Sequence, residues 1–275
     1  MGKFSQTWSL MSECWQVLKQ DKTLVLFPLI SAICCMLLMA SFAVPIVLTG
    51  VWHPPGHEAA MVQQVAYYGT LFAFYVVNYF IVIFFNSALV ACAAARLTGG
   101  TPTFGDGIRT ALSRLPVIAG WALVSATVGL LLKVIEDRSD KIGQIVAGLI
   151  GMAWTVMTFL VVPVLVIENK GPIAALKEST SLLKKTWGEQ VISNCSFGLI
   201  FFVLSLPAFL LVGLAIYVHT SVVVAVCLSL AVIYWVALAL INSALHAIFQ
   251  TALYLYARDG HIEGFNAEVL GGALR

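Results

Sequence analysis

Charged residues are scarce in this chain, and their scarcity argues against most soluble folds. Only 10% of the 275 residues are Asp, Glu, Lys or Arg, whereas 60% are hydrophobic. A soluble domain carries roughly 25% charged residues, because its surface must be solvated by water. The net charge of +2 is also too small for the basic footprint of a nucleic-acid-binding protein. We therefore expect an integral membrane protein that contacts lipid and does not bind nucleic acid.

Motifs for metal binding, cofactor binding and catalysis are also lacking. None of the six cysteines forms a Cys-x-x-Cys pair, and most lie in apolar runs, which favours packing roles over metal or disulfide roles. The sequence has no Gly-rich phosphate loop and no Gly-x-Ser-x-Gly motif. Residues 1–23 lack the pattern of a signal peptide. We expect no metal, no cofactor and no catalytic residue, and we favour a non-enzymatic role.

Long apolar segments are what the chain has instead, and six of them can cross a bilayer, which takes about 20 helical residues. They cover residues 24–49, 65–97, 115–135, 142–167, 191–218 and 221–256. Pro45 should kink or end the first span near its far end, and Pro163 should bend the end of the fourth. The second and sixth spans are longer than a bilayer requires, so their last turns should project beyond the hydrocarbon.

Three shorter segments combine an apolar stripe with polar residues, as helices lying in the membrane interface do. They cover residues 4–18, 101–114 and 168–189. The stripe of the first recurs at spacings of four and three and consists of Phe4, Trp8, Met11, Trp15 and Leu18. Trp8, Trp15 and Trp187 are predicted interfacial anchors, because tryptophan favours the depth of the lipid headgroups.

An internal repeat links the apolar and amphipathic segments. Residues 86–104 read NSALVACAAARLTGGTPTF, and residues 242–265 read NSALHAIFQTALYLYARDGHIEGF. Both begin near the end of an apolar run and pass through an Arg and a Gly-containing turn to a Phe. We interpret the unit as an amphipathic segment followed by an apolar hairpin, used three times. The units cover about residues 1–97, 101–167 and 171–257 of a single membrane domain, 1–275, in which 258–275 form a cytoplasmic tail.

The distribution of lysine and arginine predicts the orientation. Most of the 15 lie in four segments, which are residues 1–23, 96–114, 168–190 and 258–275. Cytoplasmic loops are enriched in these residues, so both termini and all three amphipathic helices should be cytoplasmic. The predicted fold class is all-α, a polytopic membrane protein of six transmembrane helices. They form three hairpins, each preceded by a cytoplasmic in-plane amphipathic helix.

Polar side chains near the ends of the spans are the candidate site. The deep interior of the spans lacks Asp, Glu, Lys and Arg, which argues against an acidic proton relay or a charge-ringed pore. Asn86 and Asn242 are equivalent in the repeat, and His246 and Gln250 follow Asn242 on one helix face. Together with Glu168 at a span end, these residues form a predicted polar cluster. A structural role in interhelical hydrogen bonding is favoured over a polar cavity.

Three stretches carry a resemblance to a known family: FSQTWSLMSECWQVLKQDKTLVLFPL, VVPVLVIENKGPIAALKESTSLLKKTWGE and ALYLYARDG. The chain resembles an uncharacterised family of six-helix bacterial inner-membrane proteins. It is more distantly similar to the membrane domain of some glycerophosphodiester phosphodiesterases and to Yip1-type membrane proteins, which repeat an in-plane helix followed by a hairpin. The resemblance implies a helical bundle in the bacterial inner (cytoplasmic) membrane and transfers no catalytic residue.

Three functions fit these observations. The preferred one is a non-enzymatic module that organises membrane lipids or a partner, either another membrane protein or a second copy of the chain. The alternative is a transporter or channel for an uncharged or amphipathic solute, because repeats and proline-broken helices are common in carriers. The second alternative is a lipid-modifying enzyme at the cytoplasmic interface near Glu168, Asn242 and His246.

Overall fold

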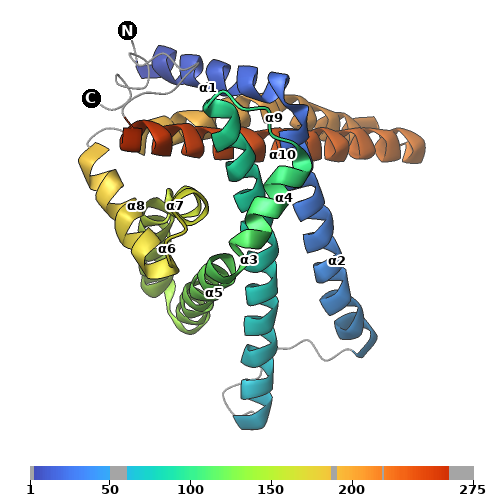
Figure 1. Cartoon of the computed structure of the whole chain (residues 1–275). Coiled ribbons are helices and arrows are strands. Elements are labelled where there is room, and N and C mark those ends of the chain that lie inside the picture. Colours follow the sequence, from blue (N-terminus) through green and yellow to red (C-terminus); the bar gives the residue numbers. More distant parts are fainter. Residues whose placement is uncertain (1–2, 50–60, 187–190, 219, 260–275) are drawn as a thin grey trace. The chain divides into compact units, whose positions relative to one another are not determined.

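The computed structural model describes residues 3–49, 61–186, 191–218 and 220–259, which form helices and short connections without any strand (Figure 1). The elements are α1 (Lys3–Gln20), the 3-10 helix η1 (Lys22–Val25), α2 (Leu26–Thr49), α3 (Met61–Leu97), α4 (Phe104–Ser113), α5 (Leu115–Arg138), α6 (Lys141–Met157), α7 (Val161–Glu168), α8 (Pro172–Thr186), α9 (Val191–Val218) and α10 (Ser221–Asp259). The predicted all-α class is confirmed. Helices form over all three predicted amphipathic segments, and their placement in the membrane plane remains a prediction.

Among the residues that the structure describes, six helical segments are long and apolar enough to cross a membrane. They are Lys22–Ala43, Met61–Leu97, Leu115–Asp137, Gly143–Glu168, Ile200–Val218 and Val222–Asp259. This agrees with the six predicted spans and supports a multi-pass membrane protein. The grouping of the spans into three repeated hairpins and the cytoplasmic position of the termini remain predictions.

Large apolar side chains on the spans are exposed rather than packed inside. The exposed fraction is 74% for Leu210, 83% for Tyr217 and 71% for Val222. An apolar surface this extensive on a water-soluble protein would drive association. In a bilayer it faces hydrocarbon, while the helical backbone satisfies its own hydrogen bonds. The outward-facing side chains are therefore those that lipid solvates.

The chain forms two compact units. Unit 1 consists of Met1–Leu26, Ala93–Thr101 and Leu182–Arg275, and unit 2 consists of Phe27–Cys92 and Pro102–Ser181. The predicted single domain with three repeat units is not tested by this division and stays a prediction.

In unit 1, α9 and α10 pack along each other, and α1 packs on both of them (Figure 1). The hydroxyl of Tyr234 on α10 donates a hydrogen bond to the carbonyl oxygen of Leu204 on α9, at 2.6 Å. An edge-to-face pair of Phe209 and Trp235, with ring centroids 5.2 Å apart, joins the same two helices. Aromatic packing and one hydrogen bond therefore fix the register between α9 and α10.

In unit 2, α4 lies against α3 and the start of α2. The rings of Phe27 and Phe104 stack with centroids 4.7 Å apart. Gly107 faces α3 so closely that a Cβ atom there would lie 2.8 Å from the carbonyl oxygen of Ala88. Both Gly107 and Ala111 are buried, because small residues allow helices to approach closely.

The fourth span is interrupted, which differs from the expected bend at its end. Helix α6 stops at Met157, and α7 begins at Val161. A continuous helix would place Pro163 opposite the carbonyl of Phe159, where its ring clashes and no N–H is available to bond that oxygen. The break instead puts Pro163 in the first turn of a new helix, where a missing N–H is tolerated.

A side chain from α8 bridges this interruption. The hydroxyl of Ser179 donates to the carbonyl oxygen of Met157 at 2.7 Å and accepts from the N–H of Leu160 at 3.2 Å. Ser179 is buried. Backbone groups released inside a membrane protein need such partners, because hydrocarbon offers none. By contrast, α2 continues through Pro45 to Thr49, so this proline does not end its helix.

The start of α4 carries a capping box that makes its stability depend on pH. The N–H and hydroxyl of Thr103 donate to the Asp106 carboxylate at 2.9 and 2.7 Å, and the Asp106 N–H donates to the Thr103 hydroxyl at 3.3 Å. These hydrogen bonds, from the side chain of Thr103 first and then from its backbone, lower the pKa of Asp106. Because the pKa of Asp106 is lower in the folded than in the unfolded protein, the ionised carboxylate stabilises the folded state at pH values above the unfolded-state pKa of about 3.9. This stabilisation is lost as the pH falls through the folded-state pKa.

We therefore expect Thr103→Ala to lower the stability of the protein at pH 7 by about 0.5–2 kcal/mol. The difference between wild type and variant should narrow as the pH is lowered from 6 to 3, because protonated Asp106 no longer accepts these bonds. Thermal unfolding of the two proteins in detergent across this range measures the effect. A difference that stays constant with pH would contradict the role of the carboxylate.

Candidate functional site

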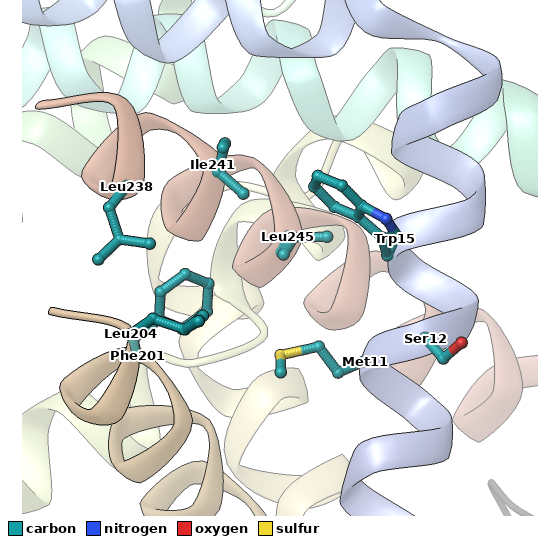
Figure 2. Close-up of a pocket in the computed structure, with 8 residues that line it drawn as sticks. All are labelled: Met11, Ser12, Trp15, Phe201, Leu204, Leu238, Ile241 and Leu245. Atoms are coloured by element: carbon teal, nitrogen blue, oxygen red, sulfur yellow. The ribbon is translucent and has the colours of Figure 1, made fainter. Parts of the chain in front are cut away.

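An apolar pocket of about 340 Å³ lies within unit 1, where α1 meets α9 and α10. Figure 2 shows its lining side chains, which are Met11, Ser12, Trp15, Phe201, Leu204, Leu238, Ile241 and Leu245. The volume is within the range of about 300–1,000 Å³ that is usual for small-molecule pockets. Ser12 carries the single hydroxyl among these side chains, so the pocket suits an apolar ligand.

Two faces of the α9–α10 pair form the apolar wall of the pocket. Phe201 and Leu204 come from α9, and α10 supplies residues at spacings of three and four, namely Leu238, Ile241 and Leu245. Residues at these spacings lie on one side of a helix. Because the Tyr234 hydroxyl is bonded to the Leu204 carbonyl, the two faces are held in register beside the pocket.

Helix α1 forms the other wall, and Met11 and Trp15 of the predicted stripe line the pocket. Cys14 and Leu18 are buried, whereas Trp15 is 38% exposed and lines the pocket. Burial raises the pKa of the Cys14 thiol well above its usual range, and the neighbouring Glu13 carboxylate adds to the shift. Cys14 is therefore an unreactive packing residue. Trp15 therefore lies at the edge of the buried face of α1, next to the pocket.

Basic residues gather where α1 ends. The Lys19 ammonium lies 5.6 Å from the centroid of the Trp15 ring, within the range of a cation–π contact. A guanidinium nitrogen of Arg96 donates to the side-chain oxygen of Gln20 at 3.1 Å. Lys22 follows in η1 and is exposed. The apolar pocket therefore has a cationic edge on its α1 side.

The predicted polar cluster is divided between the two units. Asn242, His246 and Gln250 belong to unit 1, on the row of α10 next to the pocket-lining residues, whereas Asn86 and Glu168 belong to unit 2. Asn242 is exposed, and His246 and Gln250 are half-buried. The assembly of these five residues into one site thus remains a prediction. None of them lines the pocket.

The two Asn-Ser-Ala-Leu stretches of the predicted repeat have partly different environments. The Ala-Leu pair is buried in both, at residues 88–89 and 244–245. In the first stretch Asn86 is half-buried and Ser87 is buried, whereas in the second stretch both Asn242 and Ser243 are exposed. The shared apolar pair serves packing, and in the second copy its leucine, Leu245, also lines the pocket.

Glu168 takes part in an ion-pair network at the surface of unit 2. The Lys170 ammonium bridges the carboxylates of Glu168 and Glu178, the latter at 3.3 Å. These hydrogen bonds, to Glu168 first and then to Glu178, raise the pKa of Lys170. Asn169 between them ends α7 in the left-handed conformation, with φ of 53°. This arrangement connects α7 to α8 and gives Glu168 a structural partner.

The other predicted positions are only partly described. Trp15 is the predicted anchor whose side chain the structure describes, while the side chain of Trp8 and all of Trp187 lie outside the described residues. Within the described part of the chain, no group of three or more His, Cys, Asp and Glu residues could hold a metal ion.

Sequence reasoning missed the pocket, because five of its eight lining residues lie in spans that are apolar on all faces. Periodicity identifies a buried face only where apolar and polar residues alternate around the helix. In the stretch around Leu238 and Ile241 they do not. The one available signal was on α1, where Ser12, Trp15 and Lys19 are spaced so that they share a face.

Comparison with known proteins gives a family but no described relative. The model of a family of unknown function, DUF6159, matches residues 65–265, which is well over half of the chain. No curated protein matches the chain, and no solved structure does. The matched residues include the α9 and α10 walls of the pocket and leave out α1. A relation to the phosphodiesterase membrane domain or to Yip1-type proteins is not shown and stays a prediction. The chain belongs to the family of unknown function DUF6159.

Proposed function

We propose that this protein is a non-enzymatic membrane module that organises lipid, placed in the bacterial inner membrane with both termini in the cytoplasm. The observation that carries the proposal is the apolar pocket between α1 and the α9–α10 pair. A pocket in a membrane-embedded unit is reached by the most abundant apolar molecules around it, which are lipids. Its cationic edge at Lys19 fits a position at the headgroup level, where lysine side chains extend toward water.

The extent of exposed apolar surface supports the same proposal. Side chains of α9 and α10 outside the pocket, such as Leu210 and Ile233, are 74% and 65% exposed. The protein thus presents both a continuous lipid-facing surface and a defined cavity next to it. A module of this kind selects a lipid by the difference between its free energy in the cavity and its free energy in the surrounding bilayer.

Extraction of the full chain from membranes with a styrene–maleic acid copolymer tests this function. The lipids in the purified discs should differ in class composition from the bulk membrane and from discs of an unrelated six-span protein. A stoichiometric protein partner in place of enriched lipid would assign the module to partner organisation. Discs with bulk lipid composition and no partner would contradict the proposal.

A transporter for an uncharged or amphipathic solute is the second candidate, and the interruption between α6 and α7 favours it. Broken helices in carriers expose backbone groups to a substrate near the middle of the membrane. Here the Ser179 hydroxyl bonds two of the released groups, the carbonyl of Met157 and the N–H of Leu160, so a solute would have to displace this hydroxyl to reach them. Osmotic swelling of proteoliposomes in small polyols should be accelerated if this reading holds. Swelling at the rate of empty liposomes would reject it for those solutes.

A further inference from the structure

The pocket of unit 1 is apolar inside and polar along one edge. Its inner wall consists of side chains without hydrogen-bonding groups, such as Phe201, Leu238 and Leu245. Figure 2 shows Trp15 and Met11 entering from α1 opposite these residues. Burying a polar ligand group against this wall would leave that group without hydrogen-bond partners, which is unfavourable. The inner part of the pocket therefore suits a hydrocarbon chain.

The polar edge is formed by three residues on one face of α1. Ser12, Trp15 and Lys19 are spaced by three and four residues, so their side chains follow one another along the helix. Ser12 and Trp15 line the pocket, and the Lys19 ammonium lies 5.6 Å from the centroid of the Trp15 ring. The sequence of groups from the pocket outward is thus hydrocarbon, hydroxyl and indole, then ammonium.

The surrounding charges leave this edge positive. Glu13 is turned by roughly 160–200° from the pocket-lining residues Met11 and Trp15 and by about 100° from Ser12, because each helical residue adds about 100°. The Asp21 carboxylate, which accepts hydrogen bonds from the N–H and the hydroxyl of Thr23 at 3.1 and 2.5 Å, is one anion against the cationic groups of Lys19, Lys22 and Arg96. Arg96 and Lys22 add cationic groups close to Lys19 in the chain fold, through the Arg96–Gln20 contact and the start of η1.

A glycerophospholipid has the same order of groups. Its acyl chain is apolar, its ester carbonyl accepts hydrogen bonds, and its phosphate is anionic. A fatty-acyl chain in the pocket would place the ester within the reach of the Ser12 hydroxyl and the headgroup toward Lys19. An anionic headgroup gains from this cationic edge, because each lysine near a membrane surface contributes attraction to negatively charged lipids.

We propose that the pocket binds one acyl chain of an anionic glycerophospholipid, with the headgroup held at Lys19. This inference rests on the proposed lipid-organising function and names the lipid class and the site. Met11 and Trp15 of α1 close the chain against α9 and α10, so bound lipid joins α1 to the helix pair. Occupancy of the pocket should therefore also stabilise the packing of unit 1, by preferential binding to the folded state.

Native mass spectrometry of the full chain in a mild detergent tests the site with two probes of identical acyl chains. These are dioleoyl phosphatidylglycerol, which is anionic, and dioleoyl phosphatidylcholine, which is zwitterionic. Wild type should bind one phosphatidylglycerol about fivefold more tightly than phosphatidylcholine, and Lys19→Gln should abolish this preference while binding phosphatidylcholine as wild type does. Lys177→Gln, at an exposed lysine of α8, should keep the preference.

Filling the pocket should weaken both lipids. Leu238→Phe places a larger side chain in the space for the acyl chain and should reduce the binding of both probes about tenfold. Leu204→Phe tests the same space from α9 if the first variant does not fold. The matched control is Leu230→Phe on α10, because Leu230 is 50% exposed and does not line the pocket.

The outcomes separate this site from the proposed function. If wild type retains phosphatidylglycerol but Lys19→Gln keeps the preference, the headgroup assignment is wrong. If the filled variants bind both lipids as wild type does, the pocket is not the acyl-chain site, although the protein still organises lipid elsewhere. If wild type binds neither lipid and its copolymer discs have bulk composition, the site and the proposed function both fail.

Discussion

Replacing Gly107 by alanine should destabilise the protein by about 1–3 kcal/mol, because the added methyl group overpacks the contact between α4 and α3. A Cβ atom at this position would lie 2.6 Å from the sulfur of Cys92, 2.7 Å from Cζ of Phe27 and 2.8 Å from the carbonyl oxygen of Ala88. The sulfur can rotate away, but the Ala88 carbonyl belongs to the backbone of α3. Helix α4 must therefore shift, and the Phe27–Phe104 stack shifts with it.

Gly105 provides a matched control in the same helix. A Cβ atom there would have as its nearest neighbour the hydroxyl oxygen of Thr103 at 3.7 Å, which is an ordinary contact. Gly105→Ala should therefore be neutral or slightly stabilising, since alanine favours helix more than glycine does. Thermal unfolding of both variants in the same detergent measures the difference. Equal midpoints for the two variants would show that α4 does not pack as closely on α3 as the structure has it.

Replacing Ser179 by alanine should destabilise the protein by about 1–3 kcal/mol for each of the two backbone groups that lose their partner. The serine hydroxyl bonds the carbonyl of Met157 and the N–H of Leu160, which the break between α6 and α7 leaves without helical partners. Ser179 is buried, so water cannot readily replace the hydroxyl. The loss should appear as a lower midpoint of thermal unfolding in detergent.

Ser181 on the same helix is the control for this prediction. It is exposed, so Ser181→Ala should leave the midpoint within about 0.5 kcal/mol of the wild-type stability. A Ser179→Ala protein as stable as Ser181→Ala would mean that the two backbone groups find other partners. In that case the interruption of the fourth span would not depend on α8.

The number of spans and most of their limits could be predicted from the sequence. The fifth span was predicted over residues 191–218, which are the residues of α9 (Val191–Val218). The second and sixth spans were predicted to extend beyond the hydrocarbon, and the corresponding helices α3 and α10 are long enough to do so. Length and apolar composition suffice for this, because every span must satisfy its backbone internally and face lipid. Local chemistry thus determines which segments are helical.

The position of the helix break could not be predicted in the same way. Pro163 indicated a disturbance, but the helix ends at Met157, six residues earlier in the chain, and resumes at Val161. The hydroxyl of Ser179 in α8, which tertiary packing brings to the break, bonds two of the backbone groups released there. A serine in an amphipathic segment gives no sign in the sequence of the carbonyl that it will bond.

The pocket could not be predicted from the sequence, and the predicted polar cluster stays a prediction. Asn86 and Asn242 were predicted as polar site residues because they are equivalent in the predicted repeat. The pocket is instead lined by leucine, isoleucine and aromatic residues that look like every other part of these spans. Only the residues of α1 that give the pocket its cationic edge stand out in the sequence, because they are polar or charged. Trp15, which contacts Lys19 there, was predicted as an anchor at the membrane interface.

Cysteine accessibility on the two sides of the membrane tests the central claim most directly, namely that lipid solvates the spans and that the interrupted α6–α7 segment crosses once. Single cysteines at Ser139→Cys and Lys177→Cys bracket this segment, in a background from which the six native cysteines have been removed. A membrane-impermeant maleimide added to intact cells should label Ser139→Cys from outside and reach Lys177→Cys only in inverted vesicles. Labelling of both positions from the same side would contradict the account.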